Sequence, residues 1–300
     1  MSRNTYVSRV VSAALFVATL HIADLRVSAQ AASAQTATPA TLATAADQQF
    51  TADGVTLRFR ELGTGEPVLL IHGYTATLES LSGVANLFSP THRVIALDVR
   101  GFGGSTKFSD TARFGQLMVD DVIRLMDHLR VARAHLVGHS MGAVIAANVA
   151  ARYPSRVTSA SLLAGPFYSD KATFAKETSR WASDLESGRG LTNFIQWLFP
   201  KMPPAMAATV SEQAATGNDL GSLIAVMQSL PELALAGLRT DAEKALVVVG
   251  TGDPLHPLSV AFAKASPGAR LLEIAGADHL NVMGHADAVR AMRDLARDRH

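Results

Sequence analysis

The chain has 300 residues, of which 48% are hydrophobic, and a formal net charge of +1 at pH 7. This length fits one large domain, or one domain with an insertion, and the near-neutral charge without a basic cluster argues against a nucleic-acid binder. The absence of cysteine excludes disulfides, zinc–thiolate sites, cysteine catalysis and a lipid anchor on an N-terminal cysteine.

The first 29 residues have the pattern of a secretory signal peptide. Arg3 and Arg9 precede an apolar run at residues 10–20, and small residues at 27–29 provide a cleavage site. An uncleaved membrane anchor is the alternative, but the apolar run is shorter than the roughly 20 residues that a membrane span needs. We therefore expect export, into a periplasm or out of the cell, with no stable membrane insertion after residues 1–29 are removed.

Residues 30–49 are mainly small or polar, with almost no large apolar side chain. This composition is typical of a disordered linker, so we expect the folded domain to occupy residues 50–300. Its first strand is predicted at residues 55–59, where apolar and polar residues alternate after the turn signal Asp53-Gly54.

Further along the chain, short apolar runs alternate with segments of helical spacing. The runs lie at residues 67–71, 94–97, 136–137, 157–164, 245–249 and 270–274, and helices are expected at 116–129, 143–153 and 286–297. Apolar runs too short for helices, alternating with helical segments, are typical of a mostly parallel sheet that is covered on both faces. The sequence therefore predicts an α/β fold with a doubly wound sheet.

The most informative stretch is Gly138-His139-Ser140-Met141-Gly142, which fits the pattern G-x-S-x-G. It follows a predicted buried strand and precedes an alanine-rich helix, which is the context that this pattern requires. A serine at such a turn presents its hydroxyl at the start of a helix, where backbone N–H groups and the helix dipole face a developing oxyanion. Ser140 is therefore the candidate nucleophile.

Two further residues complete a candidate constellation with Ser140. Asp253 and His279 each follow the end of a predicted strand, as Ser140 does. Reactive side chains in open α/β sheets gather at the carboxyl ends of strands, so we expect the three to lie close together. A serine hydroxyl is a weak nucleophile at neutral pH unless a base takes its proton.

Five motifs together resemble the α/β-hydrolase family of serine hydrolases. They are His72-Gly73-Tyr74, residues 98–105, residues 138–142, residues 250–253 and Asp278-His279, and they occur in the order typical of the family. The resemblance covers the chain from about Phe50 to its end, apart from one insertion. It implies an α/β-hydrolase fold, hydrolysis of a small-molecule ester, and no metal or other cofactor.

The resemblance also implies a role for each candidate. Ser140 attacks the substrate carbonyl once His279 accepts its proton, and Asp253 accepts the other ring N–H of His279. The backbone N–H groups of Tyr74 and Met141 form the oxyanion hole.

Other titratable residues compete for these roles. The alternatives to His279 are His72 and His139, expected to bond locally, His256, expected to line the pocket, and His285, expected to face solvent. The alternatives to Asp253 are Asp278, beside the base, and Asp170, after the preceding strand. Asp98 and Arg100 are interpreted as part of a structural turn.

Residues 167–240 do not continue the strand–helix rhythm, and they resemble the helical cap that many family members carry over the active site. Trp197 and Phe199 in this insertion are expected to line the substrate pocket with His256. Residues 191–238 contain only four charged residues, so we expect an apolar channel without a charged group to pair with a substrate ion.

The function that these features favour is hydrolysis of small to medium, apolar carboxylic esters through an acyl-enzyme, by an exported protein. Alternatives on the same triad are C–C bond hydrolysis, lactone opening and perhydrolysis. An aspartate at position 140 would have indicated dehalogenase or epoxide-hydrolase chemistry. A different class of function is a non-catalytic binder of small molecules on this fold. The sequence indicates no particular oligomeric state.

Overall fold

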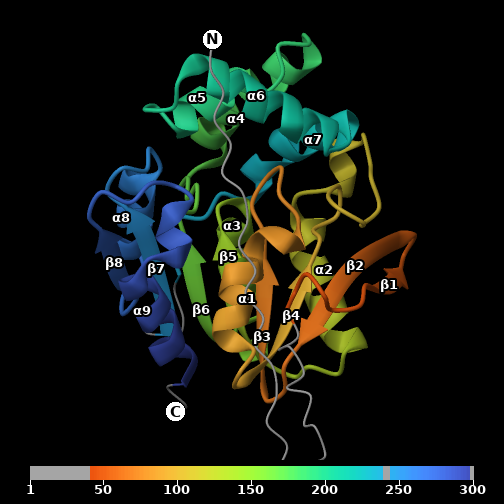
Figure 1. The fold of residues 1–300 in the computed structure, drawn as a ribbon, viewed down its shortest axis with the longest axis vertical. Coiled ribbons are helices and arrows are strands. Elements are labelled where there is room, and N and C mark those ends of the chain that lie inside the picture. The colour runs from red at the N-terminus through yellow and green to blue at the C-terminus, as the bar shows by residue number, and fades with distance from the viewer. Residues whose placement is uncertain (1–40, 239–243, 298–300) are drawn as a thin grey trace, which may run out of the picture. The chain divides into compact units, whose positions relative to one another are not determined.

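An eight-stranded sheet organises the computed structural model, which describes residues 41–238 and 244–297 (Figure 1). The strands are β1 Gln48–Ala52, β2 Val55–Leu62, β3 Glu66–Ile71, β4 His92–Leu97, β5 Ala134–His139, β6 Val157–Leu163, β7 Ala245–Gly250 and β8 Arg270–Ile274. Their spatial order is β1-β2-β4-β3-β5-β6-β7-β8, in which β1–β2 and β2–β4 pair antiparallel and every other pair is parallel. The sheet is thus mostly parallel, as predicted.

Helices cover both faces of this sheet, because side chains alternate between the two faces along each strand. On β3, Leu69 and Ile71 face a core that includes α2 Gln116–His128 and α3 Met141–Arg152. Val68 and Leu70 face the opposite core, built with α1 Ser82–Phe88 and α9 Ala286–Arg297. Since both faces of β3 are buried from Val68 to Ile71, these residues form a continuous apolar run.

In the described part of the insertion between β6 and β7, four α-helices lie beyond the ends of the parallel strands (Figure 1). They are α4 Lys171–Glu186, α5 Thr192–Leu198, α6 Pro204–Thr216 and α7 Leu220–Ser229. Asp170 and Asp219 start α4 and α7 as N-caps, accepting hydrogen bonds from backbone N–H groups of the first turn. We call α4–α7 the cap.

The described chain is folded before residue 50, so the predicted linker is wrong for residues 41–49. Strand β1 begins at Gln48, and Leu42 is fully buried. Arg60 donates a hydrogen bond of 2.8 Å from Nη1 to the carbonyl of Leu42. The predicted signal peptide, and residues 30–40 of the predicted linker, lie outside the described residues.

No helix in the described parts of the chain combines the length and the apolar character that crossing a membrane requires.

Candidate active site

Ser140 occupies a strained turn between β5 and α3. Its φ of 54° and ψ of −119° place it in a region that non-glycine residues rarely adopt. The neighbouring glycines are sterically required, because a Cβ at Gly138 would collide with the carbonyl of Gly142, and one at Gly142 with the carbonyl of Ile71. The turn is held to β6 by a 2.8 Å hydrogen bond from the Ser140 N–H to the Leu163 carbonyl.

His279 and Asp253 form a buried pair at the ends of β8 and β7. His279 Nδ1 lies 2.8 Å from Asp253 Oδ2, and the side chains are 3% and 0% exposed. Because a carboxylate accepts, Nδ1 carries the proton and Nε2 is left as the basic nitrogen. The other carboxylate oxygen accepts the Leu255 N–H at 2.9 Å, which fixes the orientation of Asp253.

His139 joins the Ser140 turn to His279. Its Nε2 lies 2.8 Å from the backbone carbonyl of His279, and the two ring centroids are 4.9 Å apart. Since a carbonyl only accepts, Nε2 of His139 carries the hydrogen. Burial, together with the neighbouring His279, lowers the pKa of His139 to about 3, so this ring is neutral at pH 7. The base candidate therefore lies beside the residue that precedes the nucleophile candidate.

A second buried histidine, His72, shapes the loop after β3. Its Nε2 accepts the Val99 N–H at 3.0 Å, so Nδ1 carries the proton and donates to the Gly73 carbonyl at 2.8 Å. Burial lowers the pKa of His72 and keeps the ring neutral. Gly73 packs against the nucleophile turn, because a Cβ there would lie 3.1 Å from the Ser140 Cβ. The Tyr74 backbone that follows is thus held next to Ser140.

The Met141 N–H is the second candidate oxyanion donor. Met141 is the first residue of α3, and the first N–H groups of a helix have no intrahelical acceptor. The N–H groups of Tyr74 and Met141 therefore come from two segments that both adjoin Ser140.

The cap holds the loop that contains Tyr74. The buried Tyr74 hydroxyl donates to the Leu223 carbonyl of α7 at 2.9 Å, and Asn218 Nδ2 donates to the Thr75 carbonyl at 3.0 Å. Thr75 has a φ of 64°, a strained value for a β-branched residue. The strain at Thr75 therefore depends on contacts that the cap supplies.

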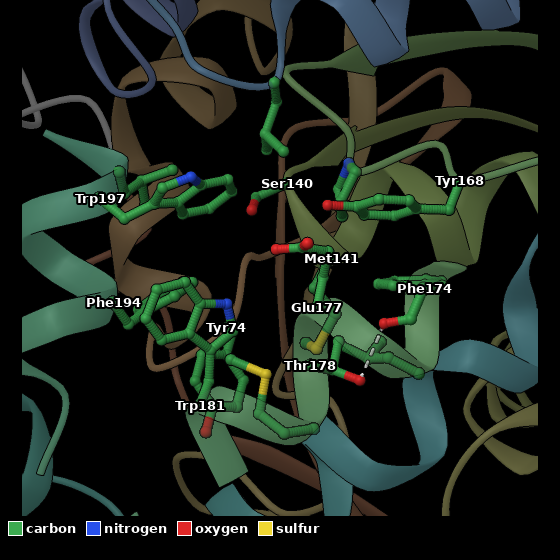
Figure 2. Close-up of a pocket in the computed structure, with 15 residues that line it drawn as sticks. Tyr74, Ser140, Met141, Tyr168, Phe174, Glu177, Thr178, Trp181, Phe194 and Trp197 are labelled. Carbon is green, nitrogen blue, oxygen red and sulfur yellow. Dashed lines mark hydrogen bonds between the residues drawn. The ribbon is translucent and has the colours of Figure 1, made fainter. Parts of the chain in front are cut away.

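An apolar cavity lies between Ser140 and the cap. Six of its lining residues are aromatic: Tyr74, Tyr168, Phe174, Trp181, Phe194 and Trp197. Figure 2 shows the Ser140 hydroxyl pointing into the cavity, with Trp197 on one side and Tyr168 on the other.

The structure corrects two of the predicted pocket residues and adds a charged one. Trp197 lines the cavity, whereas Phe199 is not among the lining residues and packs against His279, with ring centroids 6.2 Å apart. His256 does not line the cavity, because its Nε2 binds Glu273 Oε1 at 2.6 Å. Glu177 does line it, contrary to the expectation of a channel without a charged group.

The sequence contains a helical pattern that relates the cavity-lining residues of α4, which were not predicted. Phe174, Glu177, Thr178 and Trp181 all line the cavity and fall on one face of α4, at spacings of three and four residues.

The competing carboxylates have structural roles. Asp278 accepts two backbone N–H groups of its own loop, and Asp170 accepts the N–H of the third residue of α4. Asp98 is fully buried and binds Arg58 at 2.8 Å. Within residues 41–238 and 244–297, no group of three His, Asp or Glu side chains could hold a metal ion. Asp253 is thus the carboxylate whose side chain contacts His279.

The α/β hydrolase fold family profile matches residues 66–286. The dihydrolipoyllysine-residue acetyltransferase component of the acetoin cleaving system of Pseudomonas putida is 32% identical over 265 residues, which cover 81% of this chain and 67% of that protein. Among solved structures, a bromoperoxidase from Bacillus anthracis has a TM-score of 0.70 at 20% identity, over 84% of this chain and 100% of that one. A thermophilic esterase from Thermogutta terrifontis has a TM-score of 0.67 at 24% identity, over 84% of this chain and 98% of that one.

We predict that the folded state loses stability as the pH falls from about 6.5 towards 3. Burial, and then the charge of His92, lowers the pKa of His135 to about 3, as burial does for His139. In the unfolded chain both rings bind protons near pH 6.5, whereas in the folded state they stay neutral. Below pH 6.5 the free energy of unfolding therefore falls, by up to about 1.4 kcal/mol per pH unit for each ring. Urea unfolding at pH 6.5, 5.5 and 4.5 measures this loss.

His135→Gln removes one of these rings and should make the pH dependence shallower. His285→Gln is the matched control, because the His285 side chain is 42% exposed. If the free energy of unfolding changes equally with pH in the two variants, the buried ring is not the source of the pH dependence.

Proposed function

The chain belongs to the α/β hydrolase family, and on this basis we propose that it is a serine hydrolase that cleaves carboxylic esters through an acyl-enzyme. The observation that carries the proposal is the buried His279–Asp253 pair, which His139 connects to the strained turn of Ser140 beneath the aromatic cavity. The side chains of the site, the two backbone N–H groups beside Ser140 and the cavity each fit a part of this reaction.

In the proposed first half-reaction, the Ser140 Oγ attacks the ester carbonyl carbon while His279 Nε2 takes the hydroxyl proton. Asp253 stabilises the resulting imidazolium through the Nδ1 hydrogen bond. When the tetrahedral intermediate collapses, the imidazolium returns the proton to the leaving alkoxide and the acyl group stays on Ser140. In the second half-reaction, His279 takes a proton from water while the water oxygen attacks the acyl carbon. The bond between the acyl carbon and Ser140 Oγ then breaks, His279 returns the proton to Oγ, and the acid is released.

The negative charge of the tetrahedral intermediates falls on the former carbonyl oxygen. The N–H groups of Tyr74 and Met141 would bind this oxygen, and the positive end of the α3 dipole adds to the stabilisation. The mostly apolar walls of the cavity surround these donors, and each donor is worth more in such an environment than in bulk solvent.

The mostly apolar, aromatic walls of the cavity support a compact organic ester as the substrate. One relative favours a second candidate function. The Pseudomonas putida protein is named for acetyl transfer, and an acyl-enzyme can pass its acyl group to another nucleophile in place of water. A thiol acceptor added to the assay distinguishes the two reactions, because acyl transfer forms a thioester whereas hydrolysis forms the free acid.

We predict that the protein hydrolyses short or medium p-nitrophenyl esters in a series from acetate to palmitate, and that Ser140→Ala lowers kcat by roughly 10³-fold or more. The alanine has no oxygen to form the acyl-enzyme. Ser179→Ala is the matched control, because Ser179 is exposed on the outside of α4. A wild-type protein that cleaves none of these esters would contradict the proposal, as would an alanine variant that retains activity.

The contact between Asn218 and the Thr75 carbonyl generates a second prediction. Asn218→Ala frees the strained loop that presents the Tyr74 N–H, so transition-state binding should weaken while substrate binding does not. We expect kcat to fall about tenfold with KM nearly unchanged. The exposed Asn193→Ala serves as the control. A rise in KM at constant kcat would show that Asn218 acts on the pocket and not on the oxyanion loop.

The proposal includes export, which the basic, apolar and small-residue pattern of residues 1–29 supports. We predict that the native protein lacks this stretch, because signal peptidase removes it during translocation. Mass spectrometry of the protein from the periplasm or the medium measures its N-terminus. A chain that retains residues 1–29 would contradict a cleaved signal peptide.

A further inference from the structure

Among the described residues that line the cavity, Glu177 is the only one with a charged side chain. Its side chain is 31% exposed, and Figure 2 shows its carboxylate pointing into the space between Trp197 and Tyr168. No lysine or arginine is among these lining residues. The cavity that adjoins Ser140 is therefore apolar, aromatic and negatively charged.

Arg180, one turn further along α4, shows that this corner of the cap already binds a cation. Its Nη2 lies 2.6 Å from Glu177 Oε2, and its Cζ lies 4.0 Å from the Trp181 ring centroid and 5.7 Å from that of Trp197. A guanidinium is thus held by one carboxylate oxygen and by the faces of two indoles. Arg180 itself is 46% exposed and does not line the cavity, in contrast to Glu177 and both tryptophans.

The ion pair with Arg180 engages Oε2 of Glu177, and the Glu177 side chain still lines the cavity. Tyr168 lies across the cavity, and burial, followed by the charge of Glu177, raises its pKa to about 12. A positive group that enters the cavity therefore meets a carboxylate as well as aromatic faces.

We propose that Glu177 and the surrounding aromatic rings make the cavity select esters that carry a compact organic ammonium group, over neutral esters of the same shape. A methylated ammonium ion fits this site because its surface is apolar while its charge attracts both ring faces and a carboxylate. This inference rests on the proposed ester hydrolysis and names its substrate class. Ser140, His279 and Asp253 perform the chemistry, and Glu177 determines specificity.

The test compares butyrylcholine with 3,3-dimethylbutyl butyrate, in which a neutral carbon replaces the ammonium nitrogen. For the wild-type protein we expect kcat/KM to favour the cationic ester by about tenfold. Glu177→Gln keeps the shape of the side chain and removes the charge, so the preference should fall towards unity. The circular dichroism spectrum and the melting temperature of the variant show whether it is folded.

Two further variants separate the charge in the cavity from charge elsewhere on the cap. Glu186→Gln removes an exposed carboxylate from the same helix and should leave the preference unchanged. Arg180→Gln removes the partner of Glu177 and should raise the preference for the cationic ester. A loss of folding could not produce this opposite effect.

Binding can be measured without turnover, because the chain has only two tryptophans and both line the cavity. Titration with tetramethylammonium should change the tryptophan fluorescence saturably, and roughly fivefold more weakly in Glu177→Gln, whereas the neutral tert-butyl alcohol should have little effect at the same concentration. If binding depends on Glu177 but no ester is cleaved, the cation site stands and ester hydrolysis is wrong. If neutral esters are cleaved and neither binding nor preference changes in Glu177→Gln, ester hydrolysis stands and the cation site is wrong.

Discussion

The contact between β5 and α3 at the Ser140 turn is the constraint on which the rest of the site depends. There is no room for a side chain at Gly138 or Gly142, because backbone carbonyls occupy the space. This close approach forces Ser140 into its strained conformation and brings β3, through Ile71, against the start of α3. The surrounding sheet holds the strain in place. The same packing fixes the serine, the first N–H of the helix and the loop after β3 relative to one another.

The cap positions the second part of the site, the loop that contains Tyr74. Two hydrogen bonds, from the Tyr74 hydroxyl and from Asn218, connect the cap to the loop that carries the Tyr74 N–H. The same insertion supplies most of the aromatic rings over Ser140 and the single charged group among the described lining residues, Glu177. Substrate binding and oxyanion stabilisation therefore share one structural element. A change in the position of the cap would alter both together.

The strands and the Ser140 turn could be predicted because short-range patterns determine them, and His279 and Asp253 follow from their places after strands. Strand β1 could not be predicted in this way. Its sequence is mostly polar and its residues are largely exposed, so it depends on pairing with β2. Glu177 is on a recognisable helical face, but the spacing does not tell whether that face meets the core or a cavity. His256 was misplaced because its partner, Glu273, comes from β8, a long-range contact.

Three histidines gather around the Ser140 turn, and their contacts separate their roles. His72 and His139 each donate to a backbone carbonyl, and burial lowers the pKa of both, so they remain neutral and position the loops on either side. His279 differs from them because its Nδ1 meets a carboxylate. A positive charge that forms on His279 is compensated by Asp253, whereas a charge on the other two rings would be buried without such a partner. In the proposed mechanism, the environment therefore selects His279 as the ring that accepts the serine proton.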